Sequence, residues 1–393
     1  MYRKHLFKIP DNLIYLDGNS LGPLLKKVIP RSESVIKEEW GNNLIKSWNE
    51  SNWIGYPKKL GNLIAKILNA PKNTISVGDT LSIKLFQALA AAIDLKKNRN
   101  VILTDTGNFP SDIYIAKGFA DNHKRNIKLK IVPSEAILKE INEDVAIVML
   151  THVNYKTGKM YDMREVTKIC HKNKSIIIWD LAHSAGAVPV DLENSNCEFA
   201  VGCTYKYLNG GPGSPAYIYI RNDIIEKSST ILQGWMSHIN PFDFSLNFVP
   251  AKTIDLMRIG TPAVIQMSIL EESLKLWKDI NVNDLRKNSI ELSELLIKGV
   301  KKKCPEIKLL SPMNPELRGS HVSFLSENGY AIIQTMINKN IIGDFRYPNV
   351  MRFGITPLYI NEDDILETVD VLEKIVKTKS WNKEKFLKKK YVT

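Results

Sequence analysis

The chain has 393 residues, of which 44% are hydrophobic and 24% are charged, so a largely disordered protein is excluded. This length exceeds what one hydrophobic core usually serves, about 250–300 residues, and predicts a large domain with a smaller one. The formal charge of +12 suits anionic partners, but no basic run is interleaved with aromatic residues, so a lysine-rich solvated surface explains it better than nucleic-acid binding.

The middle of the chain alternates short apolar runs with helical patterns such as Met163 to Lys172. Several of the runs are β-branched without polar alternation, which is typical of strands covered on both faces. The alternation predicts an α/β domain built on a mainly parallel sheet. The expected strands are residues 101–105, 128–132, 145–150, 175–180, 199–204 and 215–220.

The last third of the chain changes character. Thr261 as N-cap and Pro262 at the first helical position predict a helix that continues through Trp277. Helical patterns also cover 283–303 and 362–377, and strand patterns cover 319–324 and 350–353. We therefore expect a large domain at 46–269, a smaller α+β domain at 270–393, and an N-terminal segment, 1–45, that packs beside the smaller domain.

The cysteines Cys170, Cys197, Cys203 and Cys304 form no CxxC pair and no Cys/His cluster with zinc spacing. We expect no metal site, and reduced, buried thiols as in a cytoplasmic protein. The sequence shows no signal peptide and no run of about 18 apolar residues, so no membrane span is expected.

An apolar strand pattern ends at Trp179-Asp180 and is followed by Leu-Ala-His183. Ligands of open α/β sheets bind at the carboxyl ends of the strands, and a buried carboxylate needs a cationic partner. The protonated pyridine nitrogen of pyridoxal phosphate (PLP) is such a partner, and the pairing makes that cofactor an electron sink. Taken alone, Asp180 is explained better as a cap of the following turn.

A lysine follows the next strand pattern, in Cys203-Thr-Tyr-Lys-Tyr-Leu-Asn-Gly-Gly-Pro-Gly213. An amine at the end of a buried strand is costly unless it is paired or chemically converted. A Schiff base with PLP achieves this conversion. A surface lysine before a turn is the alternative, but Lys206 together with Asp180 favours the cofactor.

A phosphate site is predicted where Gly78-Asp-Thr-Leu-Ser82 precedes the helical run 83–93. Free backbone N–H groups at a helix start, with the Thr80 and Ser82 hydroxyls, suit a phosphate dianion, although simple helix capping is an alternative. The sequence contains no GxxxxGK[ST] or GxGxxG motif, which disfavours a P-loop or a Rossmann cofactor site.

Further motifs lie along nearly the whole chain: Leu16-Asp-Gly-Asn-Ser-Leu-Gly-Pro23, Phe109-Pro-Ser-Asp112, Tyr205-Lys-Tyr-Leu-Asn209, Gly234-Trp235 with His238, Arg258-Ile-Gly-Thr-Pro262, and Met351-Arg352 through Pro357-Leu-Tyr359. Together with the Asp180 and Gly78 segments, this set resembles the kynureninases. These are PLP enzymes of fold type I, in the class-V aminotransferase-like group. The resemblance implies the fold of a PLP-dependent transferase, with a large mainly parallel-sheet α/β domain and a smaller α+β C-terminal domain.

The resemblance also implies roles for individual residues. Lys206 would hold PLP and move the substrate's Cα proton, Asp180 would pair with the ring nitrogen, and Tyr205 would bind the phosphate and donate a proton near the substrate. Other implied cofactor contacts are Leu81, Ser82, Phe109, Asp112, Thr151, His183 and, from the partner subunit of a homodimer, Trp235 and Thr261.

For the substrate, the resemblance implies that Arg352 clamps the α-carboxylate, since a guanidinium binds a carboxylate bidentately. A surface ion pair is the alternative for Arg352. The aryl group needs an apolar pocket, for which Trp48, Trp53 and Trp235 are candidates. Structural positions in the core explain Trp48 and Trp53 at least as well.

The implied reaction is hydrolytic Cβ–Cγ cleavage of L-kynurenine or 3-hydroxykynurenine to anthranilate or 3-hydroxyanthranilate and L-alanine. It belongs to the kynurenine pathway of tryptophan catabolism and to NAD biosynthesis. A cysteine desulfurase or another class-V lyase is an alternative, but Cys304 lies at a lysine-rich helix end and lacks an obvious mobile loop. A non-enzymatic binding protein is disfavoured by the presence of Lys206, Asp180 and Arg352.

Overall fold

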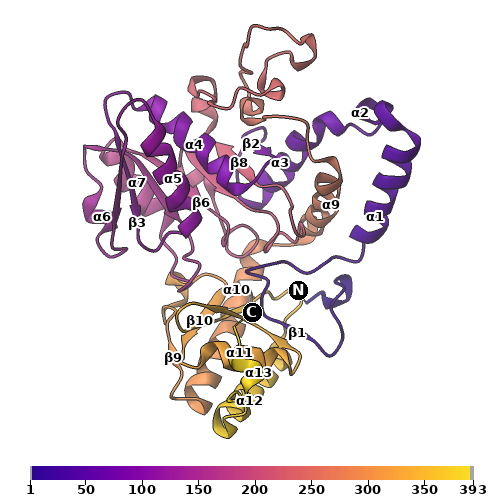
Figure 1. The fold of residues 1–393 in the computed structure, drawn as a ribbon, viewed down its shortest axis with the longest axis vertical. Helices are drawn as coiled ribbons and strands as arrows, with labels where there is room; N and C mark the ends of the chain where they lie inside the picture. The colour runs from indigo at the N-terminus through magenta and orange to yellow at the C-terminus, as the bar shows by residue number, and fades with distance from the viewer. Residues whose placement is uncertain (1, 390–393) are drawn as a thin grey trace.

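A seven-stranded sheet forms the centre of the upper, larger lobe of the molecule in Figure 1. The computed structural model describes residues 2–389, so the last residues of the expected C-terminal domain, 390–393, lie outside the described residues. In spatial order the strands are β2 (Ile75–Val77), β8 (Tyr217–Ile220), β7 (Phe199–Gly202), β6 (Ile176–Asp180), β5 (Val145–Thr151), β3 (Val101–Asp105) and β4 (Lys128–Val132). From β7 to β4 all neighbours are parallel, whereas β8 is antiparallel to both β7 and β2.

Both faces of this sheet are buried, as the side chains of β6 show. Ile176 and Ile178 pack with helices α4 (Leu81–Leu95) and α5 (Pro110–Asn122), whereas Ile177 and Trp179 belong to the core on the opposite face. Successive strand residues point to opposite faces, so a strand covered on both sides must be apolar throughout. The predicted α/β architecture is therefore confirmed. The opposite face is covered by α3 (Tyr56–Ile67) and α7 (Met163–Lys172), and short helices α6 (Ile137–Glu140) and α8 (Leu192–Ser195) complete this lobe.

The helix predicted to begin with Thr261 and Pro262 begins later, so this prediction was wrong. Helix α9 spans Val264–Lys275, and its N-cap position, Ala263, makes no side-chain capping bond. The N–H of Met236 donates to the carbonyl of Ile259 at 3.3 Å, so the chain just before Thr261 is tied to another loop, and the backbone of Ala263 is not helical. The expected domain boundary at residue 270 falls within α9, and the division into domains stays a prediction.

The lower lobe in Figure 1 is built on a four-stranded antiparallel sheet with the order β12-β13-β10-β9. The helices predicted at 283–303 and 362–377 are confirmed as α10 and α12, which pack against each other. The elements are α10 (Val282–Lys303), β9 (Lys308–Leu309), β10 (His321–Leu325), α11 (Gly329–Ile337), β12 (Asp344–Arg346), β13 (Val350–Gly354), α12 (Glu362–Thr378) and α13 (Glu384–Leu387).

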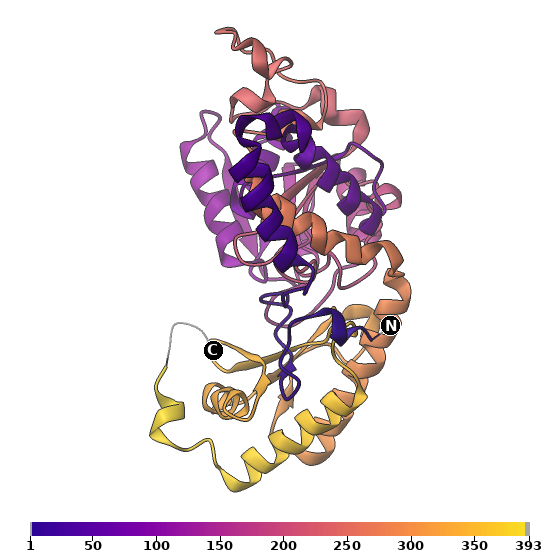
Figure 2. The same cartoon turned by 90° about the vertical axis from the view of Figure 1, so that its right-hand side faces the viewer.

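The N-terminal segment touches both lobes, and Figure 2 shows it crossing the junction between them. Strand β1 (Ile14–Tyr15) pairs in parallel with β11 (Ile341–Ile342) of the lower lobe. Helix α1 (Val28–Ser34) packs against α9 and continues through a π-helical stretch, Val35–Asn42, toward α2 (Ser47–Glu50). The 3₁₀ turns are Lys4–Leu6, Leu44–Lys46, Trp53–Gly55, Asn222–Lys227, Trp235–Ser237, Pro241–Asp243, Ile254–Met257, Leu276–Asp279 and Pro315–Leu317.

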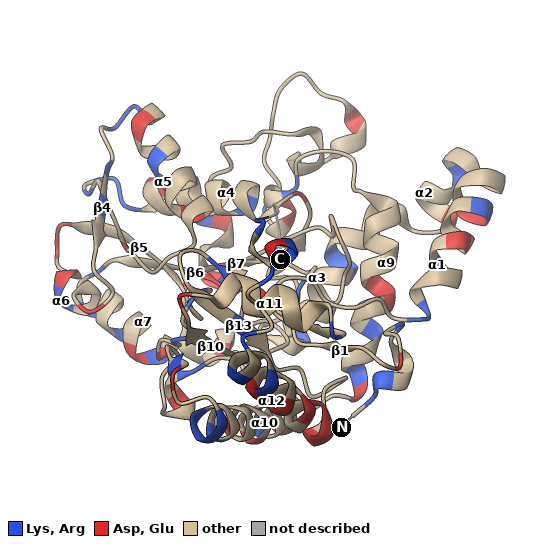
Figure 3. Ribbon diagram, turned by 60° about the horizontal axis from the view of Figure 1, so that its bottom comes forward, with Lys and Arg blue, Asp and Glu red and all other residues tan. Residues whose placement is uncertain are grey.

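Lysine and arginine positions are interspersed with aspartate and glutamate positions along the ribbon of both lobes (Figure 3). Among residues 2–389, the helices are all too short or too polar to cross a lipid bilayer. The same part of the chain contains no group of three or more histidine, cysteine or acidic side chains placed to hold a metal ion.

Candidate active site

Polar side chains gather at the carboxyl edge of the parallel strands, where α/β sheets bind ligands. Asp180 is the last residue of β6 and pairs in register with Thr151, the last residue of β5. The chain leaves β7 at Gly202 and reaches Lys206 shortly afterwards. A cavity of about 210 Å³ opens here, lined by Thr80, Leu81, Ser82, Phe109, Ser111, Asp112, Asp180, Ala182, His183, Cys203, Tyr205 and Lys206.

Two buried acids form one wall of this cavity. One oxygen of Asp180 accepts a hydrogen bond from the Ala182 N–H at 2.8 Å, and the other lies 3.4 Å from the Thr151 hydroxyl. Neither carboxyl oxygen of Asp112 has a hydrogen-bond partner among the described residues. Burial raises the pKa of Asp180, and burial together with the charge of Asp180 raises the pKa of Asp112 well above its usual range. The charge of Lys206 only partly opposes these rises, and the protonated ring nitrogen of PLP is a further cation that would suit the pair.

Lys206 faces these acids, and its amine donates to Nε2 of His183 across 3.3 Å. Burial, followed by the charge of Lys206, lowers the pKa of His183 well below its usual range. The imidazole is therefore neutral, and its Nε2 accepts the hydrogen bond from Lys206. A second histidine, His321, lies behind it with the ring centroids 5.8 Å apart. His321 is fully buried, and its ring nitrogens have no hydrogen-bond partner within residues 2–389. Sequence reasoning missed His321, because its position depends on the packing of one lobe against the other.

Tyr205 lines the cavity beside Lys206, whose amine lies 5.6 Å from the centre of the phenol ring. Burial raises the pKa of Tyr205, and the charge of Asp180 adds to the rise, so the phenol keeps its proton. The carbonyl of Tyr205 accepts from the N–H of Gly22 at 2.8 Å. A β-carbon on Gly22 would lie 2.2 Å from the Lys206 carbonyl oxygen, so only glycine fits this contact.

The first turn of α4 forms another part of the cavity wall. Its N-cap, Thr80, accepts from the Ile83 N–H at 3.4 Å, and Leu81 and Ser82 line the cavity at the positive end of the helix dipole. This geometry suits a phosphate. Behind it, the fully buried amine of Lys84 bonds Asp79 at 2.9 Å, an ion pair that fastens the turn to the helix.

Phe109 stands at the mouth of the cavity with 41% of its surface exposed. The Phe109 and Tyr155 rings meet edge to face, with 5.1 Å between their centres, so Tyr155 holds the Phe109 ring in place. Phe109 also lines the cavity, where a flat ring could stack on it. Thr151 lies behind Asp180, outside the cavity lining, and its hydroxyl bonds Asn108.

Five other predicted residues lie away from the described walls of this cavity: Trp48, Trp53, Trp235, Thr261 and Arg352. The three tryptophans pack together, with Trp48 6.4 Å from Trp53 and 6.5 Å from Trp235 between ring centres. Thr261 lines a separate pocket of about 150 Å³. Within one chain, therefore, none of these four reaches the space between Lys206 and Asp180.

Arg352 is 1% exposed, so it is not the surface ion pair that the sequence left open. Its Nε donates to Asp344 Oδ1 at 2.7 Å, and one terminal nitrogen bonds the other oxygen of the same carboxylate. The other terminal nitrogen bonds the carbonyl of Tyr155. Sequence reasoning missed Asp344, which occupies much of the predicted carboxylate clamp.

All four cysteines are buried, and burial raises the pKa of each thiol, to about 11 for Cys304 and about 12 for Cys197. They are therefore protonated near neutral pH and poor nucleophiles. A cysteine desulfurase needs a nucleophilic cysteine, so these protonated, buried thiols argue against that alternative.

A strand-end lysine opposite a buried acid pair, on this sheet topology, defines a PLP enzyme of fold type I. Solved structures agree in fold. A C-DES mutant with glycine covalently linked to the PLP cofactor superposes with a TM-score of 0.83 at 18% identity, over 95% of this chain and 99% of that one. The apo cysteine desulfurase of Thermococcus onnurineus NA1 gives a TM-score of 0.81 at 17% identity, over 95% and 97%.

Sequence comparison narrows the class to one family. Residues 285–372 match the model of the kynureninase C-terminal domain, and residues 59–198 match the DegT/DnrJ/EryC1/StrS aminotransferase family. The chain is 42% identical to kynureninase from Pseudomonas fluorescens and 38% identical to that from Burkholderia pseudomallei, in both cases over 98% of this chain and 95% of the relative. The chain belongs to the kynureninase family, the PLP enzymes that hydrolyse a carbon–carbon bond of kynurenine.

Proposed function

We propose that this chain hydrolyses the Cβ–Cγ bond of L-kynurenine, of 3-hydroxykynurenine or of both, and releases anthranilate or its 3-hydroxy derivative with L-alanine. The observation that carries the proposal is the meeting of Lys206 and Asp180 in one cavity, in a chain of the kynureninase family. We place the reaction in the kynurenine pathway of tryptophan catabolism, which supplies NAD biosynthesis, and in the cytoplasm.

When bound, PLP supplies an electron sink for charge that develops at the substrate's Cα. Lys206 holds the cofactor and moves the Cα proton. Asp180 would pair as a carboxylate with the ring nitrogen and would keep that nitrogen protonated, with Asp112 as a neighbouring polar group. Contacts proposed around the ring and phosphate are Leu81, Ser82, Phe109, Thr151 and His183.

Tyr205 is proposed as the proton donor near the substrate. Its raised pKa supports this role, because the phenol enters the reaction protonated at neutral pH. Arg352 is proposed to bind the substrate α-carboxylate, although Asp344 already occupies two of its nitrogens. Water attacks the γ-carbonyl of the substrate. Tyr205 directly precedes Lys206 in the chain, so its protonated phenol lies in the same cavity as the lysine that moves the Cα proton.

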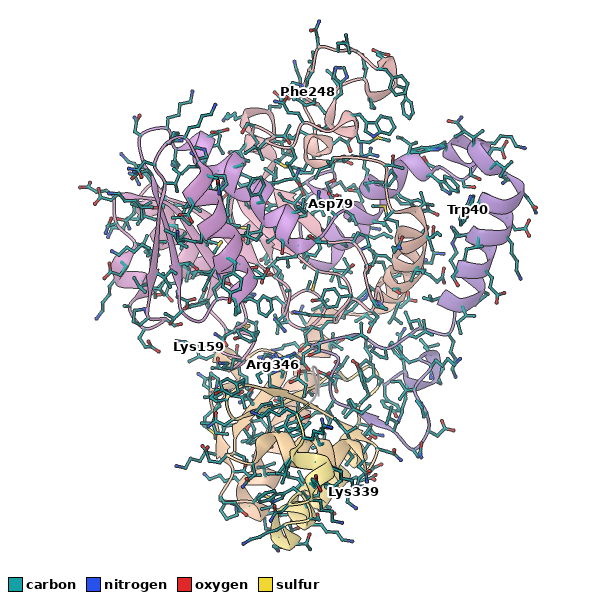
Figure 4. All side chains as sticks on the ribbon, viewed as in Figure 1. Trp40, Asp79, Lys159, Phe248, Lys339 and Arg346 are labelled. Carbon is teal, nitrogen blue, oxygen red and sulfur yellow. The ribbon has the colours of Figure 1, made fainter. Side chains whose placement is uncertain are left out.

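We also propose a twofold homodimer with composite sites. Trp235 and Thr261 lie outside their own chain's cavity, and a second copy would bring them to it. The α1–α2 arm and the 240s loop project from the upper lobe, where Figure 4 labels Trp40 and Phe248. Apolar side chains on these segments are widely exposed, a pattern of surfaces that bind another protein. They include Trp40 at 57%, Leu44 at 60%, Ile45 at 76%, Phe244 at 72% and Leu246 at 103%.

The aromatic cluster of Trp48, Trp53 and Trp235 is proposed to reach the aryl group of the substrate in the partner's cavity. Mixing Lys206→Ala with Trp235→Ala protein tests the composite site. Hybrid dimers keep one intact site, so part of the activity should return. A fully active monomer in sedimentation contradicts the arrangement.

We further propose the domain division already expected, 46–269 and 270–393, with residues 1–45 beside the smaller domain. The pairing of β1 with β11 supports the placement of the N-terminal segment.

The reaction itself is tested by incubating the PLP-loaded enzyme with both substrates and measuring the aromatic amine and alanine. We expect equal amounts of the two products from at least one substrate. Release of sulfide and alanine from cysteine, without aromatic amine from either substrate, contradicts the proposal.

A further inference from the structure

A second guanidinium lies beside Arg352. One terminal nitrogen of Arg346 donates to Asp344 Oδ2 at 2.8 Å and lies 3.1 Å from the Ser20 hydroxyl. Arg352 shares both of these partners and lies 3.0 Å from Ser20. Since Arg352 already binds both oxygens of Asp344, the carboxylate does not need Arg346 for its neutralisation.

The two arginines differ in how much of their hydrogen-bonding capacity is used. The side chain of Arg346 is 39% exposed, against 1% for Arg352. Within residues 2–389, Nε and the other terminal nitrogen of Arg346 bond no protein group. Figure 4 labels Arg346 at the junction of the two lobes. Arg346 is therefore the accessible member of the pair.

The charges of this cluster do not balance. Asp344 is ionised, because Arg352 overcomes the effect of burial and holds the pKa of Asp344 at about 2. Burial, followed by the charge of Asp344, raises the pKa of the other nearby acid, Asp17, to about 7. The two guanidinium groups thus carry two positive charges, whereas the two acids carry one full and one partial negative charge. The remaining positive charge suits the binding of a monoanion.

The cluster is close to the cavity. Arg352 donates to the carbonyl of Tyr155, and the Tyr155 ring meets Phe109, which lines the cavity, with 5.1 Å between ring centres. Burial lowers the pKa of His183, and the charges of Arg352 and Arg346 are among the smaller causes. Arg346 also opposes the rise in the pKa of Tyr205 that burial produces. His183 and Tyr205 both line the cavity, so a ligand in the cavity also experiences the positive charge of the two guanidinium groups.

We propose that Arg346 is a further substrate-binding residue, which forms the accessible half of a two-arginine site for the substrate's α-carboxylate. Asp344 and Ser20 hold the two guanidinium groups in register. This inference rests on the proposed function, because it needs an amino-acid substrate.

The test uses PLP-loaded Arg346→Gln enzyme, with Arg346→Lys to retain the charge. Loss of a charge-assisted hydrogen bond should raise the KM for L-kynurenine about 10- to 100-fold and change kcat less than about 3-fold. The dissociation constant of L-alanine, titrated by the visible absorbance of the cofactor, should rise by a similar factor. The kynurenine analogue that lacks the α-carboxylate should be processed or bound equally by Arg346→Gln and wild type. Arg346→Lys should recover part of the loss.

The matched control is Lys339→Gln, which removes one exposed positive charge from the lower lobe (Figure 4) and should change none of these values. Equal losses for kynurenine and for the carboxylate-free analogue overturn the inference, since they indicate a structural role. Unchanged L-alanine binding in Arg346→Gln also overturns it, as does wild type that binds L-alanine no better than ethylamine. Failure of wild type to release aromatic amine overturns the proposed function alone, because the L-alanine titration still tests Arg346.

Discussion

Replacing Arg352 with alanine separates substrate binding from structural support. The Arg352–Asp344 ion pair is almost completely buried, with side-chain exposures of 1% and 2%. Removing the guanidinium leaves the carboxylate of Asp344 without its main partner. Breaking a buried ion pair from one side costs about 3–5 kcal/mol of folding stability. We expect the lower end, about 3 kcal/mol, because Arg346 and Ser20 still bond the same carboxylate oxygen.

The loss of activity has a different origin. If Arg352 binds the substrate carboxylate, its removal costs about 2–5 kcal/mol of transition-state binding, or roughly 30- to several-thousand-fold in kcat/KM. PLP should still bind, because Arg352 lies outside the cofactor cavity. The double variant Arg352→Ala/Asp344→Asn should recover most of the stability, since it removes the unpaired charge, but little of the activity.

The pH dependence of stability has a definite sign. In wild type the pKa of Asp344 is about 2, below the unfolded value of about 3.9, so its stabilisation is present above pH ~4 and disappears as the pH falls through ~2. In Arg352→Ala, burial dominates and raises this pKa above the unfolded value. The ionised carboxylate then costs stability at neutral pH, and acid relieves the cost. The stability deficit against wild type should therefore shrink between pH ~7 and ~5.

Denaturant unfolding of wild type, Arg352→Ala and the double variant at several pH values measures these differences, alongside kynurenine kinetics. Two results refute the reasoning. One is Arg352→Ala within about 1 kcal/mol of wild type at pH 7, which means that the buried pair does not contribute as argued. The other is a deficit that neither pH nor Asp344→Asn changes.

Three further predictions concern the cofactor site and its rival chemistry. The loaded protein should absorb near ~420 nm, and borohydride should fix PLP on the peptide that carries Lys206; label on another lysine contradicts the assignment. Asp180→Asn should keep its fold but lose about 10²-fold or more in kcat, because the ring nitrogen loses its charge partner; near-normal turnover contradicts this role. Cys304→Ser should retain kynurenine cleavage, since the pKa of the buried thiol is raised to about 11, whereas loss of a sulfide-releasing activity would support the desulfurase alternative.

Long apolar strands could be predicted from the sequence because burial on both faces leaves a local pattern. The strands at 101–105 and 128–132 have the predicted bounds. Strands of two or three residues, such as β1 and β2, leave no such pattern, since too few positions exist to show alternation. The start of α9 was misjudged for another reason. The chain just before Thr261 is tied to another loop through Ile259, and a tertiary contact of this kind leaves no local sequence pattern.

The candidate site divides in the same way. Asp180 ends a strand, Lys206 follows one and Ser82 lies in the first turn of a helix, and positions of this kind lie at the edge of an α/β sheet where ligands bind. His321 and Asp344 instead approach the cavity from the sheet of the lower lobe, so their positions depend on contacts between residues far apart in the sequence. No short-range pattern predicts those contacts.

The Leu16–Pro23 motif illustrates how the two kinds of information meet. From the sequence it is a glycine-rich turn that supports a family resemblance. In the structure, its Gly22 N–H donates to the Tyr205 carbonyl at 2.8 Å, while the Ser20 hydroxyl donates to Asp344 at 2.7 Å. One short loop thus touches the lysine-bearing segment of the upper lobe and the arginine-binding carboxylate of the lower lobe. This loop therefore connects the segment that carries Lys206 with the carboxylate that binds the two arginines, and its contact with the Lys206 backbone leaves no room for a side chain at Gly22.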